Sequence, residues 1–185
     1  MAENPPRLTF EEGGALAAFS ASSRSTCPRA HVGCALFNKN KVIKGTGYNG
    51  ARSGAPQCDQ VGCLMIDGHC KSASHAEDNA ILFARNSDLT GGYSFVTVRP
   101  CKNCFDLNMA VGIAHIYYLD EYRSELHKDY IEEECKKRGI ELKRLDIDIV
   151  SVVQKALAFH QGPGGLLNNK NKLTIEEHIP EMMDH

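Results

Sequence analysis

The sequence has no tryptophan, few aromatic residues and no excess of charge of either sign. Aromatic side chains make up 7% of its 185 residues, and 21 Lys plus Arg against 23 Asp plus Glu give a formal net charge of −2. A dedicated duplex-DNA-binding protein carries a basic field, and a single-strand binder combines a positive groove with aromatic platforms. The composition supports neither class, so we expect no duplex nucleic acid as a partner.

Long apolar runs are also missing. No uninterrupted stretch approaches the roughly 18 residues that a membrane-spanning helix needs. The first residues, Met-Ala-Glu-Asn-Pro-Pro, lack the charged and apolar blocks of a signal peptide. We therefore expect a cytoplasmic protein with no membrane partner. The length suits one ordinary domain with a real hydrophobic core.

Helical and extended segments alternate along the chain, which predicts an α/β fold. The apolar pattern, the β-branched runs and the glycines at 112 and 139 set the limits of these segments. The predicted helices are 8–22, 76–86, 102–111, 125–137 and 149–159, and the predicted strands are 31–37, 41–48, 93–98, 113–119 and 140–145. Residues 49–74 show no periodicity, and so long a loop is uncommon unless something holds it or it has a function. We expect one domain over residues 1–165 and a polar tail over 166–185.

Eight cysteines are present, and in a reducing compartment clustered thiols more often bind a metal or take part in catalysis than form disulfides. Two of them form the motif Pro100-Cys101-Lys102-Asn103-Cys104, and a second motif reads His75-Ala76-Glu77. Each motif begins a predicted helix, whose N-terminal dipole favours a thiolate. Two thiolates and one imidazole are three zinc ligands, which leaves the fourth tetrahedral position for water, as in a catalytic zinc site.

Glu77 follows His75 by two residues, close enough to the metal to take a proton from its water without being a ligand. Taken singly, a C-x-x-C pair is typical of a structural zinc knuckle, and a His-x-Glu pair means little. Together, in this order, the two motifs match the signature of zinc-dependent nucleobase deaminases.

From about Arg24 to Tyr122, the sequence resembles the cytidine and deoxycytidylate deaminase superfamily, and within it the deoxycytidylate (dCMP) branch. Three segments carry the resemblance: Gly45-Thr46-Gly47-Tyr48-Asn49-Gly50 followed by Gly54, His75-Ala76-Glu77-x-Asn79-Ala80-Ile81, and Thr97-x-x-Pro100-Cys101-x-x-Cys104. The resemblance implies a three-layer α/β/α sandwich with a mixed central sheet.

The same resemblance implies roles for individual residues. His75, Cys101 and Cys104 are expected to bind zinc, Glu77 to shuttle protons and Asn49 to hydrogen-bond the sugar of the substrate. The implied reaction is the hydrolytic deamination of dCMP to dUMP and ammonia, which feeds thymidylate synthesis. Members of this branch form homo-oligomers, often hexamers, and dCTP and dTTP act on some of them as effectors.

Four further cysteines suggest a second, structural zinc site. Members of the branch can carry one in this loop, and here its ligands are expected to be Cys27, Cys58, Cys63 and Cys70, with His69 as an alternative to the adjacent Cys70. Such a site would hold the loop in place. The alternative is free thiols in a mobile loop. The remaining two, Cys34 and Cys135, are expected in the core.

The chain departs from the branch at two positions. Arg52 stands where the branch usually has proline, in a region that helps to bind a triphosphate effector, so effector regulation stays open. Arg99, which is bulky and charged, precedes the metal-site proline. Alternatives are therefore deamination of dCTP, of a modified dCMP, of a nucleoside or of a base in RNA. A non-catalytic zinc or nucleotide-binding protein on the same fold is a further alternative, although such a protein has no use for Glu77.

Overall fold

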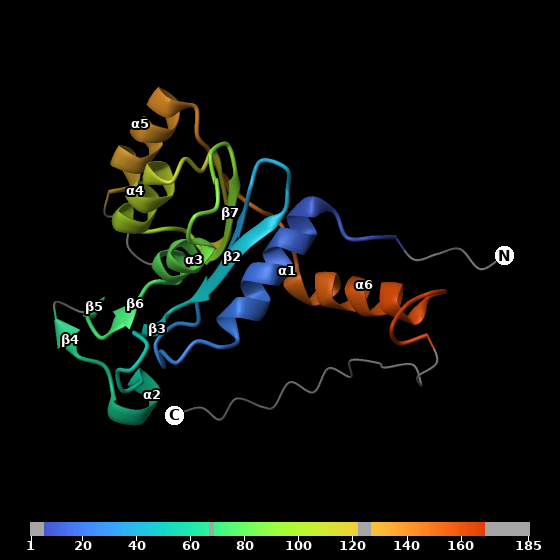
Figure 1. Ribbon diagram of the computed structural model, residues 1–185, viewed down its shortest axis with the longest axis horizontal. Helices are drawn as coiled ribbons and strands as arrows, with labels where there is room; N and C mark the ends of the chain where they lie inside the picture. Colours follow the sequence, from blue (N-terminus) through green and yellow to red (C-terminus); the bar gives the residue numbers. More distant parts are fainter. Residues whose placement is uncertain (1–5, 67–68, 122–126, 169–185) are drawn as a thin grey trace.

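A five-stranded mixed sheet forms the centre of the protein (Figure 1). The computed structural model describes residues 6–66, 69–121 and 127–168. The strand order is β2-β1-β7-β8-β9, in which β1 pairs antiparallel with β2 and β7, and β7, β8 and β9 run parallel. The strands are β1 (Gly33–Phe37), β2 (Ile43–Tyr48), β7 (Tyr93–Val98), β8 (His115–Asp120) and β9 (Glu141–Arg144). The five predicted strands and the mixed sheet are confirmed.

Helices cover both faces of this sheet, which confirms the three-layer α/β/α sandwich (Figure 1). Residues of β1 show the division between the faces, because Cys34 and Leu36 pack in one apolar cluster, and Ala35 and Phe37 in the other. The first cluster includes side chains from α3 (Ala76–Ala84), α4 (Lys102–Ala110) and α5 (Lys128–Arg138). The second includes α1 (Phe10–Ser22), against which α6 (Ile149–Gln161) packs.

The helix that carries the His-Ala-Glu motif lies very close to strand β2. A Cβ atom on Gly45 would come within 2.5 Å of the carbonyl oxygen of Ala80, so glycine is needed for this approach. The amide of Asn79 on α3 donates a 2.8 Å hydrogen bond to the carbonyl oxygen of Tyr48 at the end of β2. Close packing and this bond together fix the position of α3 on the sheet.

The described part of residues 49–74 forms short elements rather than the loop without regular structure that the sequence predicts. These elements are β3 (Gly50–Ala51), α2 (Cys58–Val61), β4 (Met65–Ile66), β5 (His69–Cys70) and β6 (Ala73–Ser74). Strands β3 and β6 pair with each other, and β4 pairs with β5. Two-residue strands and a single helical turn are too short to leave a periodic pattern in the sequence, which explains the difference.

The helix ends agree with the glycine signals. Gly139 closes α5 in the left-handed conformation at φ 66°, and Gly112 follows α4 at φ 83°. The start predicted for α5, and most of the tail predicted over 166–185, lie outside the described residues. The division into a domain and a tail stays a prediction. Within the described part of the chain, no helix has the length and apolar content to span a membrane.

Candidate functional site

His75, Cys101 and Cys104 meet where two helices begin. His75 is the N-cap residue of α3, Cys101 is the N-cap residue of α4, and Cys104 lies in the first turn of α4. The Nδ1 atom of His75 is 3.2 Å from the Sγ of Cys104 and 3.6 Å from the Sγ of Cys101. The structure therefore brings together all three residues of the predicted catalytic metal site.

These distances fit a tetrahedral zinc site. With Zn–N and Zn–S bonds of ordinary length, tetrahedral geometry separates the nitrogen and sulfur ligands by about 3.6 Å. Cys104 is buried, Cys101 is half-buried and His75 is exposed, so the group opens to solvent on the His75 side. Two thiolates and an imidazole match the ligand preference of zinc and leave one position open.

Hydrogen bonding within the cluster favours the thiolate that a metal needs. The hydrogen bond with Cys104 is the largest influence on Cys101 and lowers the pKa of its thiol to about 4. The hydrogen bond with Cys101 raises the pKa of His75 to about 9. The hydrogen bond with Cys101, followed by burial, raises the pKa of Cys104. The cluster thus shares its protons, and a metal that binds it displaces them.

Glu77 is the second residue of α3 and is only 3% exposed. Burial raises the pKa of this carboxyl to about 7, while the charges of His75 and Cys101 and a hydrogen bond with Cys104 also act on it. The carboxyl is therefore next to the metal cluster and shielded from bulk water. A carboxyl in this position can both accept and return a proton near neutral pH.

The side-chain amide of Asn49 makes most of its possible hydrogen bonds within the protein. Its Oδ1 accepts hydrogen bonds from the Val32 backbone N–H (2.8 Å) and the Ser25 hydroxyl (2.6 Å), and its Nδ2 donates to the Ala30 carbonyl oxygen (2.8 Å). An amide oxygen has two lone pairs, so the acceptor is filled and one N–H remains. The sequence predicts that Asn49 offers both a donor and an acceptor to the sugar of the substrate. In the structure, one N–H donor of the side chain remains for it.

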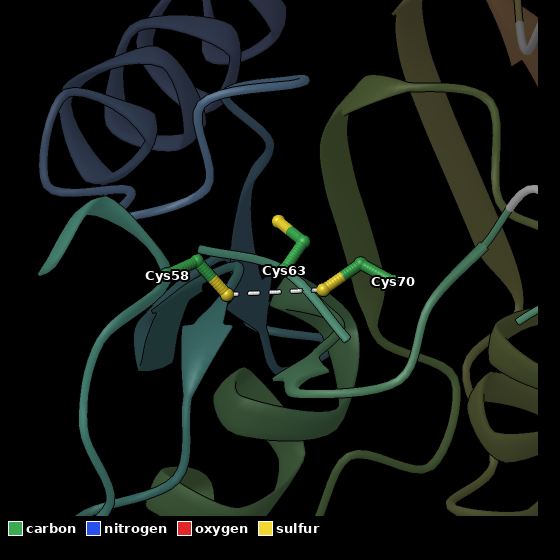
Figure 2. Close-up of side chains that lie close together, drawn as sticks. All are labelled: Cys58, Cys63 and Cys70. Atoms are coloured by element: carbon green, nitrogen blue, oxygen red, sulfur yellow. Dashed lines mark hydrogen bonds between the residues drawn. The ribbon is translucent and has the colours of Figure 1, made fainter. Parts of the chain in front are cut away.

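Three thiols of the predicted structural zinc site lie close together (Figure 2). Cys58 begins α2, Cys63 follows that helix, and Cys70 ends β5; their sulfur atoms all lie within 4.8 Å of one another. The Cys58 and Cys70 sulfurs are 3.7 Å apart, close to the roughly 3.8 Å between two sulfur ligands on a tetrahedral zinc. All three are free thiols. The group therefore fits a metal.

Cys27, the fourth predicted ligand, is buried but does not belong to this group. Its charge nevertheless acts on Cys58, where it adds to burial in raising the pKa of that thiol. Cys70 lies in the cluster, whereas the side chain of His69 lies outside what the structure describes. Cys34 is fully buried, and Cys135 packs against the core, as the sequence predicts.

Two cavities have walls that include residues close to the two motifs in the sequence, Arg99 in one and Ser74 in the other. One, of about 510 Å³, contains Arg99, which is 8% exposed, lies over the Tyr118 ring and pairs at 3.8 Å with Glu121 and with Glu132 of α5. The other, of about 460 Å³, lies beside His75 and contains Lys71. Sequence reasoning missed Lys71. Its signal is the segment Lys71-Ser72-Ala73-Ser74, which leads directly into His75.

Comparison with known protein families agrees with this site. Residues 11–120 match the model of the cytidine and deoxycytidylate deaminase zinc-binding region. The chain belongs to the cytidine and deoxycytidylate deaminase family. The chain is 37% identical over 129 residues to ComE operon protein 2 of Bacillus subtilis, an alignment that covers 68% of this chain and 65% of that protein.

Two proteins named as deaminases are similar to this chain over much of their length. The deoxycytidylate deaminase of Mycobacterium phage D29 is 36% identical over 115 residues, which cover 56% of this chain and 89% of that protein. The crystal structure of dCMP deaminase from the cyanophage S-TIM5 in complex with dCMP and dUMP superimposes with a TM-score of 0.63. It shares 28% sequence identity, over 76% of this chain and 99% of that one.

Proposed function

We propose that the protein is a zinc-dependent deoxycytidylate deaminase, which converts dCMP and water to dUMP and ammonia. The observation that carries the proposal is the buried carboxyl of Glu77 beside the cluster of His75, Cys101 and Cys104. The names of the phage relatives, one of them solved with dCMP and dUMP, support dCMP as the substrate.

His75, Cys101 and Cys104 would hold the catalytic zinc, and Glu77 would move the protons. When bound, zinc lowers the pKa of a neighbouring water to about 7 and polarises the substrate. Glu77 accepts a proton as water adds to carbon 4 of cytosine, and delivers it to ring nitrogen 3. The same carboxyl then carries a proton to the departing amine, so ammonia leaves and the carbonyl of uracil forms. Burial of Glu77 keeps bulk water from competing for these protons.

A second zinc is proposed at Cys58, Cys63 and Cys70, with Cys27 as the fourth ligand. Support comes from the 3.7 Å sulfur separation and from the effect of the Cys27 charge on Cys58. A metal at this position would tie α2 to the β4–β5 hairpin and to the chain that follows α1.

The family resemblance also leads us to propose a cytoplasmic homo-oligomer, a hexamer, with dCTP and dTTP as effectors. Exposed apolar side chains on two neighbouring helices, Leu82 and Phe83 of α3 and Leu107 of α4, support self-association. The same reasoning places the protein in nucleotide biosynthesis, where dUMP is the precursor of thymidylate.

The test is a deamination assay on zinc-loaded protein, followed by the absorbance change from cytosine to uracil. We would compare dCMP, dCTP, deoxycytidine and cytidine, and include Glu77→Gln, which keeps the size of the side chain. We expect turnover of dCMP, lowered about 10²- to 10⁴-fold by Glu77→Gln, with zinc content unchanged. Turnover of dCTP alone would make dCTP, rather than dCMP, the substrate. Zinc-loaded protein that is inactive on all four compounds would overturn the proposal.

A further inference from the structure

The cavity of about 460 Å³ beside His75 has a distinctive lining. Ser74 and Asp78, which form part of its wall, flank His75 in the sequence, so the cavity adjoins the catalytic metal cluster. Arg52 and Lys71 also line the cavity. Its volume is in the usual range for small-molecule sites.

Positive charge in this cavity has no partner within the protein. Neither Arg52 nor Lys71 has a side-chain hydrogen bond or ion pair with any residue that the structure describes. Asp78 also lines the cavity, and its negative charge contributes to the raised pKa of His75. Two cations against one carboxylate leave a net positive charge.

Other cations near the metal cluster are engaged elsewhere. The guanidinium of Arg24 lies over the Tyr48 ring at 5.9 Å, and Arg99 pairs with Glu121 and Glu132. Arg29 contacts the sulfur of Met65 at 3.5 Å. Arg52 and Lys71 differ from these three arginines, because neither has such a contact with a described residue, and both are free to meet a ligand.

The backbone holds both cations in place. Arg52 directly follows β3, whose residues Gly50 and Ala51 pair with Ser74 and Ala73 of β6. Lys71 directly follows Cys70, a member of the thiol cluster, and its N–H donates to the Leu64 carbonyl oxygen at 2.8 Å. The backbone positions from which the two side chains extend are thus fixed before any ligand arrives.

Hydroxyl groups complete the lining. The Ser72 Oγ accepts a hydrogen bond from the Leu64 N–H at 3.1 Å, so its own proton can be donated, and Ser74 also lines the cavity. Cations with hydroxyl donors are the groups that recognise phosphate oxygens.

We propose that this cavity binds the phosphate of a nucleotide, with Arg52 and Lys71 as counter-charges and Ser72 and Ser74 as hydrogen-bond donors. This inference rests on the proposed function, because a nucleotide whose base reaches the metal cluster brings its phosphate to the adjoining cavity. A second nucleotide that binds here through its phosphates uses the same chemistry. The thiol cluster then has a part in recognition, since it positions Lys71.

The test removes each charge without changing the metal ligands. We would prepare Arg52→Gln, Lys71→Gln and the double variant, with Lys143→Gln on the far strand β9 as a control for the loss of one exposed charge. The readouts are the ratio of kcat/KM for dCMP to that for deoxycytidine, and calorimetric binding of dCMP and dCTP to zinc-loaded Glu77→Gln protein. We expect the double variant to lower the ratio about tenfold or more, with Lys143→Gln near wild type.

The outcomes separate the sources of phosphate. A lower dCMP ratio assigns the cavity to the phosphate of the substrate, whereas weaker dCTP binding with an unchanged dCMP ratio assigns it to a second nucleotide. Unchanged ratio and unchanged binding of both nucleotides in the double variant would overturn the inference. Binding that depends on Arg52 and Lys71 in a protein that deaminates nothing would overturn the proposed function and leave this inference standing.

Discussion

Gly47 lies directly against Ala76, the first residue of α3. A Cβ atom on Gly47 would come within 2.3 Å of the Ala76 carbonyl oxygen and 2.4 Å of the Ala80 nitrogen. Ala76 stands between His75 and Glu77, so any shift of the helix moves a metal ligand and the catalytic carboxyl together. We expect Gly47→Ala to destabilise the protein by about 1–3 kcal/mol through overpacking, and to reduce zinc content and kcat.

Gly13 provides a matched control for Gly47→Ala. It lies within α1, and a Cβ atom there would have no other atom within 4 Å. Because alanine favours a helix over glycine by up to about 1 kcal/mol, Gly13→Ala is expected to raise stability and leave zinc content unchanged. Urea unfolding and metal analysis of the two variants test this, and a Gly47→Ala protein with wild-type stability and kcat would contradict the packing argument.

Much of the fold and the central part of the site follow from local sequence. Strand β7 matches its predicted bounds because Tyr93–Val98 is a continuous aromatic and β-branched run between turns. Cys101 and Cys104 could be predicted as a pair because both lie at the start of α4, where spacing in sequence determines spacing in space. His75, at the start of α3, is added to the pair by the known signature of the deaminases. Here local pattern and tertiary structure agree.

The features that the sequence does not reveal depend on distant contacts. The acceptor of Asn49 is filled by Ser25 and Val32, and nothing in the motif around Asn49 indicates which residues the chain will bring there. Cys27 is separated by 31 positions from Cys58, so its distance from the three-thiol group depends on how two loops pack. Lys71 lines the same cavity as Arg52 because strands β6 and β3 pair, and the sequence gives no sign of that pairing.

The second metal site leads to a prediction about metal content. Zinc-loaded wild-type protein is expected to contain two zinc ions per chain, and Cys63→Ser about one, because Cys63 belongs only to the second cluster. Cys135→Ser is the control, since Cys135 packs against the core away from both clusters. Metal analysis by mass spectrometry gives the count.

Cys27→Ser then decides the fourth ligand. Loss of one zinc ion, as in Cys63→Ser, would confirm Cys27 as a ligand, whereas full retention of both ions would remove it from the set. A wild-type protein that holds one zinc ion even at excess metal would contradict the second site altogether.

Asn49 is expected to affect stability as well as substrate binding. Asn49→Ala removes the hydrogen bonds that the side chain makes with the Val32 N–H and the Ala30 carbonyl, and each lost hydrogen bond costs about 0.5–1.5 kcal/mol. Ser25→Ala removes only one of the two donors to Oδ1 and should cost less. Urea unfolding at constant zinc measures both. An Asn49→Ala protein of wild-type stability with a raised KM would show that the residue acts on substrate alone.

The ion pair between Glu12 and Lys155 predicts how the attachment of α6 depends on pH. The Lys155 Nζ lies 2.9 and 2.7 Å from the two carboxylate oxygens of Glu12, which joins α6 to the first turn of α1. This hydrogen bond is the main reason that the pKa of Glu12 is lowered from 4.5. A lowered folded-state pKa means that the stabilisation is complete above pH 4.5 and is lost as the pH falls through the lowered value.

Removing the partner of Glu12 should therefore matter at neutral pH and not in acid. At pH 7, Lys155→Gln is expected to lower Tm by about 2 °C, and the difference from wild type should shrink below pH 4.5 as Glu12 takes up a proton. Comparison with wild type at each pH cancels the loss of metal in acid, which both proteins share. Lys143→Gln makes the same change in charge on β9 and should show no such trend. A difference between Lys155→Gln and wild type that stays constant from pH 7 to pH 4 would mean that Lys155 stabilises α6 through its methylene groups rather than through its charge.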